Sequence, residues 1–198
     1  MKPLVTLRTV PRTVFVGAWC VAGFLVMMVG GSFTEALFSR VGYPGAGWGG
    51  VPVTFDLASK HAALDQLAVK GTLDLFGWAQ VVDITIIIGT LIFFTALSVL
   101  VWRAQPLGGW LDRLGQRTTA AFVAAPIADA VENLTALVLI AGQPQPLTVL
   151  SLANSLATLA KTVLFIAGWV GLAGLLLATA RRTATKFSRR GLRLTKSG

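Results

Sequence analysis

Apolar residues gather into four long runs along the chain, separated by shorter stretches that hold most of the polar residues. The runs cover residues 14–31, 81–102, 119–141 and 156–180. Each is close to the roughly 20 residues that an α-helix needs to cross the hydrocarbon of a bilayer. The pattern predicts an all-α fold, an integral membrane four-helix bundle that forms a single domain over residues 1–198.

The first run follows three basic residues, Lys2, Arg8 and Arg12, a layout shared with secretory signal peptides. Its apolar stretch is longer than the 7–15 residues usual in a signal peptide. The sequence after it, residues 31–35, is a poor match to a small-x-small cleavage site. We therefore expect a retained transmembrane helix.

The longest connection joins the first two runs and covers residues 32–80. Its first half is rich in glycine and proline, which indicates irregular turns. Its second half, residues 54–70, has leucines at helical spacing and predicts a short amphipathic helix on the outer membrane surface or over the end of the bundle. The charged residues of this helix, Lys60 among them, are expected away from the leucine face. Its candidate functional residues are Asp56, Lys60 and His61. Two interpretations of this connection are open. It could be a lid or partner-docking surface, or it could be a solvated connector.

Basic residues are unevenly divided among the connections. The amino-terminal segment holds three Lys or Arg, the connection between the second and third runs holds three, and the tail at residues 181–198 holds seven. The first connection holds three and the third holds none. Because positively charged connections stay in the cytoplasm, we expect both termini inside and a location in the cell (inner or plasma) membrane.

Composition supports a membrane protein over a soluble one. Hydrophobic residues make up 55% of the chain and charged residues only 13%, with a mean hydropathy of +0.74. The net charge of +9 could suggest nucleic acid, but the cations lie at the ends of apolar runs. We expect the basic tail to lie against anionic lipids of the inner leaflet, and we do not expect nucleic acid binding.

Enzyme and metal signatures are missing from the sequence. The chain has one cysteine, Cys20, and one histidine, so neither an internal disulfide nor a Cys/His zinc site is expected. It has no glycine-rich phosphate loop and no His-Glu-x-x-His motif. We predict no bound cofactor and no metal site, and the sequence gives no positive indication of an enzyme.

Ionisable residues inside the apolar runs carry the chemical signal. Asp129, Glu132 and Asn133 are spaced three and four apart and are expected to share one helix face. Asp83 and Lys161 lie at a similar depth, near the outer ends of the second and fourth runs. Since one charge in the membrane costs at least about 2.5–3.5 kcal/mol, we expect these groups to face the bundle interior or a water-filled cleft. A cluster of Lys161 with Glu132 and Asp83 is geometrically feasible.

Three functions are compatible with this cluster. A buried polar network that fixes helix packing would suit a structural or partner-binding protein, with a protein partner or a second copy of the chain. The same residues could form the pathway of a small proton- or cation-coupled transporter or channel. They could also serve a membrane-embedded enzyme acting on a lipid headgroup. We favour the first.

A resemblance to known sequences rests on three short features. Asp56-Leu57 opens the helical part of the first outer connection, an Asp-x-x-Glu-Asn run lies in the third apolar run, and Lys161 comes early in the fourth. This pattern resembles an uncharacterised family of small bacterial membrane proteins with four transmembrane helices. The resemblance implies the four-helix fold and no particular activity.

Overall fold

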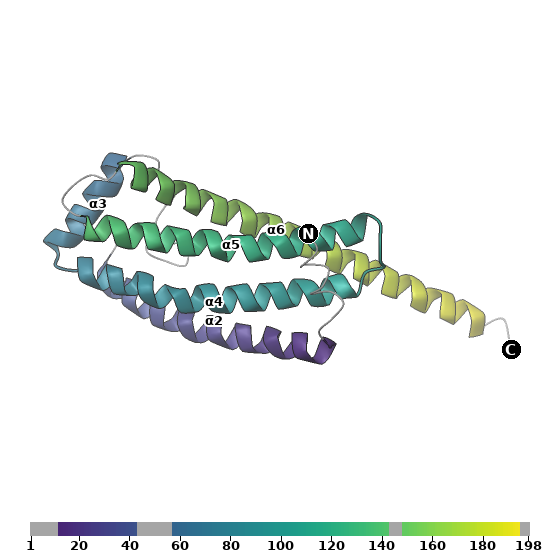
Figure 1. Ribbon diagram of the computed structural model, residues 1–198. Coiled ribbons are helices and arrows are strands. Elements are labelled where there is room, and N and C mark those ends of the chain that lie inside the picture. Colours follow the sequence, from purple (N-terminus) through teal and green to yellow (C-terminus); the bar gives the residue numbers. More distant parts are fainter. Residues whose placement is uncertain (1–11, 43–56, 143–147, 195–198) are drawn as a thin grey trace.

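The described chain consists of helices joined by short turns. The computed structural model describes residues 12–42, 57–142 and 148–194 (Figure 1). Within these residues it has five helices and no strand: α2 Thr13–Val41, α3 Leu57–Val69, α4 Leu73–Arg103, α5 Trp110–Ala141 and α6 Thr148–Leu194. All except α3 are long and apolar enough to cross a membrane. The prediction of an all-helical chain with four such helices is confirmed, and the chain is a multi-pass membrane protein.

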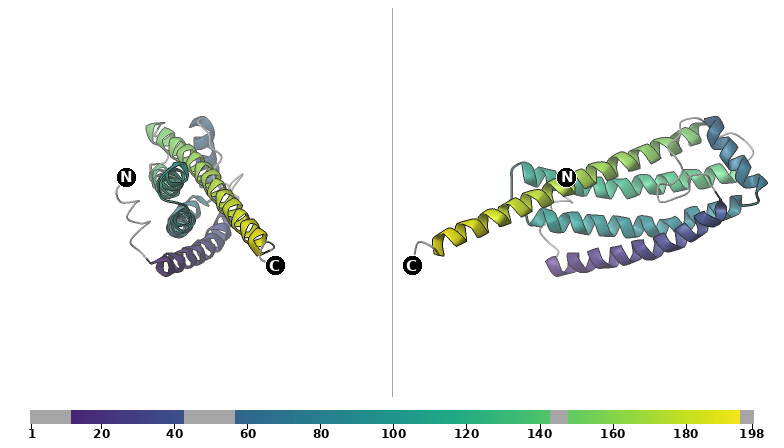
Figure 2. Two further views of the ribbon diagram at one scale, coloured as in Figure 1. Left: turned by 90° about the vertical axis from the view of Figure 1, so that its right-hand side faces the viewer. Right: turned by 180° about the vertical axis from the view of Figure 1, so that it is seen from behind.

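The long helices lie side by side in chain order. α2 packs along α4, α4 along α5, and α5 along α6, as the end-on view in Figure 2 shows. The short α3 lies across one end of the bundle, where it contacts α4 and α6 (Figure 1). We call this the α3 end, and we call the opposite end, where α4 connects to α5, the α4–α5 end. The last part of α6 extends beyond the other helices there.

The helices run further than the apolar runs from which they were predicted. α2 continues past Gly31 to Val41, and α4 begins at Leu73, so most described residues of the expected connection 32–80 are helical. Hydropathy falls where polar residues begin, but a helix can continue through them because it satisfies its own backbone groups. The glycine-rich residues 43–53 lie outside the described part of the chain.

Glycines bring α2 and α4 into direct backbone contact. A Cβ atom added at Gly23 would lie 2.5 Å from the backbone nitrogen of Phe93, and one added at Gly89 would collide with the backbone of Met27. Small residues permit this close approach, which lets dispersion forces hold two helices together in lipid. The α2–α4 seam therefore depends on glycine.

An apolar cluster holds α3 against the α3 end of the bundle. It joins the last residue of α2, two leucines of α3, the first turn of α4 and the last turns of α5: Val41, Leu64, Leu67, Phe76 and Leu139. Leu67 is only 1% exposed. The packing places one face of α3 over the ends of α5 and α6.

Aromatic side chains fill the bundle on its other half. Phe94 of α4 stacks on Phe122 of α5, with ring centroids 4.9 Å apart. From α6, Trp169 and Phe165 meet Phe94 edge-on at 5.0 and 6.2 Å. We call these four residues the aromatic cluster. It lies nearer the α4–α5 end than Asp129, by about 10 Å along α5 at 1.5 Å per residue.

Candidate functional site

Lys161 of α6 forms ion pairs with two carboxylates of α5. Its Nζ atom lies 2.9 Å from Oδ1 of Asp129 and 2.5 Å from Oε2 of Glu132. Asp129 and Glu132 are three residues apart, so both face α6. The three side chains are mostly shielded, with 21%, 15% and 11% of Lys161, Asp129 and Glu132 exposed. The arrangement ties α6 to α5 within the bundle.

Asn133 faces α4 instead of α6. Its Nδ2 atom donates to Oδ2 of Asp83 at 2.8 Å and to the backbone oxygen of Gln80 at 3.3 Å. Successive helical residues differ by about 100° in direction, so Glu132 and Asn133 reach different neighbours. The expectation that the three α5 residues share one face was therefore too simple. Asp83 accepts from Asn133, and among the described residues it forms no ion pair with Lys161.

Asn154 connects three helices, and it was not identified from the sequence as a candidate functional residue. Its Nδ2 atom donates to the backbone oxygen of Glu132 at 2.8 Å and to Oγ1 of Thr135 at 2.9 Å. Its Oδ1 atom accepts from Nζ of Lys60 at 2.6 Å. Asn154 had been placed in the connection before the fourth run, but α6 already begins at Thr148. Its position two helical turns before Lys161 was the available signal, because such residues share a face.

Lys60 projects from α3 into the bundle instead of into solvent. Its Nζ atom donates to Oδ1 of Asn154, to Oγ of Ser155 at 2.8 Å and to the backbone oxygen of Ser151 at 3.2 Å. The residue is 8% exposed. The sequence had suggested the polar face of a surface helix, but Lys60 precedes Leu64 by one turn and shares its buried face. A long apolar stem and three acceptors make this burial possible.

Burial also changes the acid–base behaviour of Lys60. Desolvation lowers the pKa of its ammonium group, and the nearby Glu132 carboxylate opposes that shift in part. The ammonium is thus held by hydrogen bonds and by a carboxylate at a distance, not by a direct ion pair.

His61 and Asp56 are the other two residues singled out in the outer helix. His61 is partly buried, and its Nε2 atom has no hydrogen-bond partner among the described residues. Asp56 lies outside the described residues. In the described part of the chain, no three His, Cys, Asp or Glu side chains converge as metal ligands.

These contacts form one connected polar network. It runs from Lys60 through Asn154 to the backbone oxygen of Glu132, and from the Glu132 carboxylate through Lys161 to Asp129. Asn133, the next residue of α5, makes a separate hydrogen bond to Asp83 on α4. The network links α3, α5 and α6 on the α3 half of the bundle, and its carboxylates are the groups that could exchange protons.

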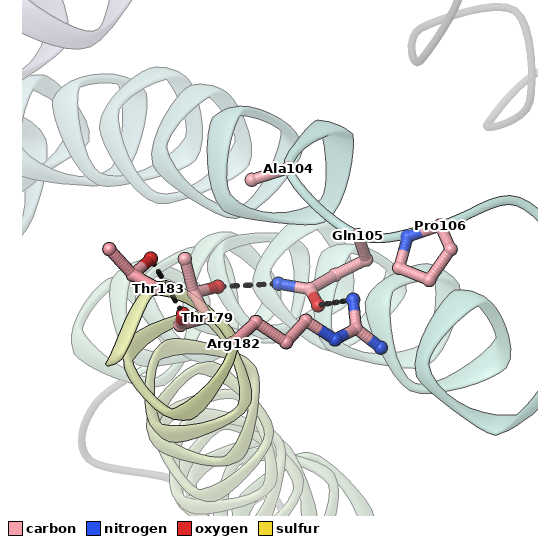
Figure 3. A pocket seen from close by; sticks show the side chains of 6 residues that line it. All are labelled: Ala104, Gln105, Pro106, Thr179, Arg182 and Thr183. Carbon is pink, nitrogen blue, oxygen red and sulfur yellow. Dashed lines mark hydrogen bonds between the residues drawn. The ribbon is translucent and has the colours of Figure 1, made fainter. Parts of the chain in front are cut away.

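Two cavities lie away from this network. One, of about 320 Å³, is an apolar groove between α2 and α4 that Val16, Trp19 and Val99 help to line. The other, of about 460 Å³, lies beside Gln105 and Arg182 at the α4–α5 end (Figure 3). No residue of the polar network lines either one.

Comparison with known proteins finds no relative. No family model, no curated protein and no solved structure matches the chain. The resemblance to a family of small bacterial membrane proteins stays a prediction. What the protein does is therefore inferred from its geometry.

Proposed function

We propose that the protein has a structural or partner-binding role in the membrane, and that the polar network locks α3 and α6 onto α5. The hydrogen bonding of Asn154 is the observation that carries this proposal. One side chain contacts Lys60 of α3 and two α5 residues, Glu132 and Thr135, at the same time. A side chain of α6 that is bonded to both α3 and α5 fixes the relative positions of the three helices.

The pairing of charges also supports a structural role. Each ionisable group of the network contacts an opposite charge or a hydrogen-bond partner. Polar groups placed in lipid are stable only when they are satisfied inside the protein. Such a network favours one packing of the helices, because any other would leave charges unpaired.

We further propose that the α3 end faces outward and that both termini lie in the cytoplasm of the cell membrane. The α4–α5 end carries five arginines at the borders of the helices: Arg103, Arg113, Arg117, Arg181 and Arg182. In a Cys20→Ser background, a cysteine at Val69 (90% exposed) should react with an impermeant maleimide on intact cells. A cysteine at Arg181 should react only after lysis, and the reverse pattern would invert the topology.

In this orientation α3 presents a surface to the outside. One face of α3 is buried on the bundle, and the opposite face exposes Asp65, Gln66 and Val69. Because Lys60 and the apolar cluster hold α3 in place, this face is a fixed surface on which a partner protein or a second copy could dock.

A small proton- or cation-coupled transporter or channel is the second candidate. The ion pairs of Lys161 with two carboxylates inside the bundle favour it. Toward the α3 end, the contacts continue from Glu132 to Lys60 through the Glu132 backbone oxygen and Asn154. Beyond Asp129 the aromatic cluster fills the core. Transport would therefore require these rings to move.

Flux measurements separate the two functions. Proteoliposomes with wild-type protein, Asp129→Asn or Glu132→Gln are compared with empty liposomes under proton and cation gradients. The structural role predicts no flux above that of empty liposomes. Wild-type flux that disappears in folded Asp129→Asn protein would instead establish the transporter. Exposed Asp65→Asn is the matched control, because it removes a carboxylate outside the network.

A further inference from the structure

A cavity at the α4–α5 end, outside the polar network, is lined by one arginine, three uncharged polar residues and two apolar residues. It has a volume of about 460 Å³ and is lined by Ala104, Gln105, Pro106, Thr179, Arg182 and Thr183 (Figure 3). The volume falls in the range of small-ligand sites. The cavity lies between α6 and the end of α4.

Gln105 holds the Arg182 guanidinium at this cavity. Its Nε2 atom donates to Oγ1 of Thr179 at 2.6 Å and to the backbone oxygen of Leu175 at 3.3 Å. These bonds orient its Oε1 atom, which accepts from Nη1 of Arg182 at 3.1 Å (Figure 3). Gln105 is only 3% exposed. The guanidinium is thus positioned before any ligand arrives, which lowers the entropy lost on binding.

The electrostatic surroundings favour an anion. None of the six lining residues is acidic, whereas exposed Arg181 precedes Arg182. Asp112, in the first turn of α5, does not line the cavity. Its carboxylate accepts from Nε1 of Trp102 at 2.7 Å and from the backbone nitrogen of Gly108 at 3.3 Å.

The apolar surroundings are those expected at the level of lipid headgroups. Leu107 and Trp110, in and next to the α4–α5 connection, are 80% and 64% exposed. Exposed tryptophan is typical of the membrane–water interface. On α6, Leu176 and Leu177 are also exposed, one to two turns before Arg182, on the part of the helix that enters the membrane. A ligand bound here would have acyl-chain contacts within reach.

We propose that this cavity binds the phosphate group of an anionic phospholipid. The Arg182 guanidinium donates charge-assisted hydrogen bonds to the phosphate oxygens, and the acyl chains lie along the exposed apolar side chains of α6. A zwitterionic lipid would bring an ammonium group to a cavity without a lining carboxylate. The proposal depends on the membrane character of the chain and not on the role of the polar network.

The test compares two neighbouring arginines in the full-length protein. Native mass spectrometry in detergent measures binding of phosphatidylglycerol and of phosphatidylcholine to wild type, Arg182→Gln and Arg181→Gln. We expect wild type to prefer phosphatidylglycerol, and Arg182→Gln to weaken that binding roughly tenfold. Arg181→Gln removes the same charge outside the cavity and should weaken it less than about threefold, because exposed charges are screened. Equal losses in the two variants, or no lipid preference in wild type, would overturn the proposal.

Two further arms test positioning and the source of the phosphate. Gln105→Leu keeps every charge but removes the amide that holds Arg182, so phosphatidylglycerol binding should fall severalfold while phosphatidylcholine binding stays unchanged. Inorganic phosphate and glycerol phosphate in millimolar excess should not displace the lipid. Displacement by either would show a site for soluble phosphates and contradict the lipid assignment. If Gln105→Leu does not fold, the comparison of Arg182→Gln with Arg181→Gln tests the proposal without it.

Discussion

The two halves of the bundle hold α4, α5 and α6 together by different means. On the α3 half, carboxylates, ammonium groups and amides contact one another across the interfaces. On the α4–α5 half, stacked and edge-on aromatic rings fill the same interfaces. Aromatic packing loses stability gradually as atoms are removed, whereas a polar network in lipid becomes unfavourable once one partner is lost. The α3 half should therefore specify the arrangement of the helices, and the α4–α5 half should contribute dispersion energy.

Lys161→Met should have the largest effect. It leaves the carboxylates of Asp129 and Glu132 without their cation, at a cost of up to about 3 kcal/mol. Reversible unfolding of the protein in mixed micelles measures the loss. Exposed Lys70→Met is the control, with little expected change. Adding Asp129→Asn and Glu132→Gln to Lys161→Met should restore much of the stability. No recovery in this triple variant would show that the carboxylates are not what the lysine stabilises.

Asn154→Ala should have the next largest effect on stability. It removes hydrogen bonds to Lys60, Glu132 and Thr135. At about 0.6 kcal/mol for each bond in a membrane, the loss is about 2 kcal/mol. The loosening should be local, so amide hydrogen exchange should rise in α3 more than in α2. Uniform exchange throughout the chain would argue against Asn154 as the residue that holds α3.

Phe122→Leu tests the aromatic half. The Phe122 ring is completely buried and stacks on Phe94. Leucine keeps most of the apolar volume but removes the ring pairing, which contributes about 1 kcal/mol, so the variant should unfold at a slightly lower denaturant concentration and keep its α3 hydrogen-exchange protection. Phe33→Leu, at a 64% exposed site on α2, is the control. A loss larger than that of Lys161→Met would reverse the comparison between the two halves.

The pH dependence of α3 docking should be the smallest effect. The pKa of Lys60 is lowered in the folded protein, so the unfolded state binds more protons at high pH. Stability should therefore rise with pH between the folded pKa and the unfolded value of about 10.4. Lys60→Met should remove this slope when unfolding is followed over that range. A slope that persists in the variant would have to come from another group.

The sequence predicted the helices better than their contacts. Four apolar runs were enough to predict four long helices, because lipid requires each span to satisfy its own backbone. Intramembrane charges were equally visible, since each is costly in lipid. Which partner each one meets depends on helix rotation, and a difference of about 100° sent Glu132 to α6 and Asn133 to α4.

Residues at the borders of the apolar runs were harder to assign. Asn154 lay outside the fourth run because the apolar pattern begins at residue 156, whereas α6 already begins at Thr148. Lys60 was placed on a polar surface because charge alone does not reveal that a lysine stem can cross an apolar face. The glycines of the α2–α4 seam also gave little signal, since glycine is common in transmembrane helices.

The α2–α4 seam has a consequence for how the protein is made. Its backbone contacts involve Gly23 and Gly89 and need no residue of α5 or α6. Because α2 and α4 precede α5 and α6 in the chain, they can pair before α5 and α6 are synthesised. In a chain that ends after Arg103, cysteines at Phe24 and Phe93, whose rings are in contact, should still be joined by a short bifunctional maleimide. The order of synthesis would then match the order of assembly, one helix pair after the other.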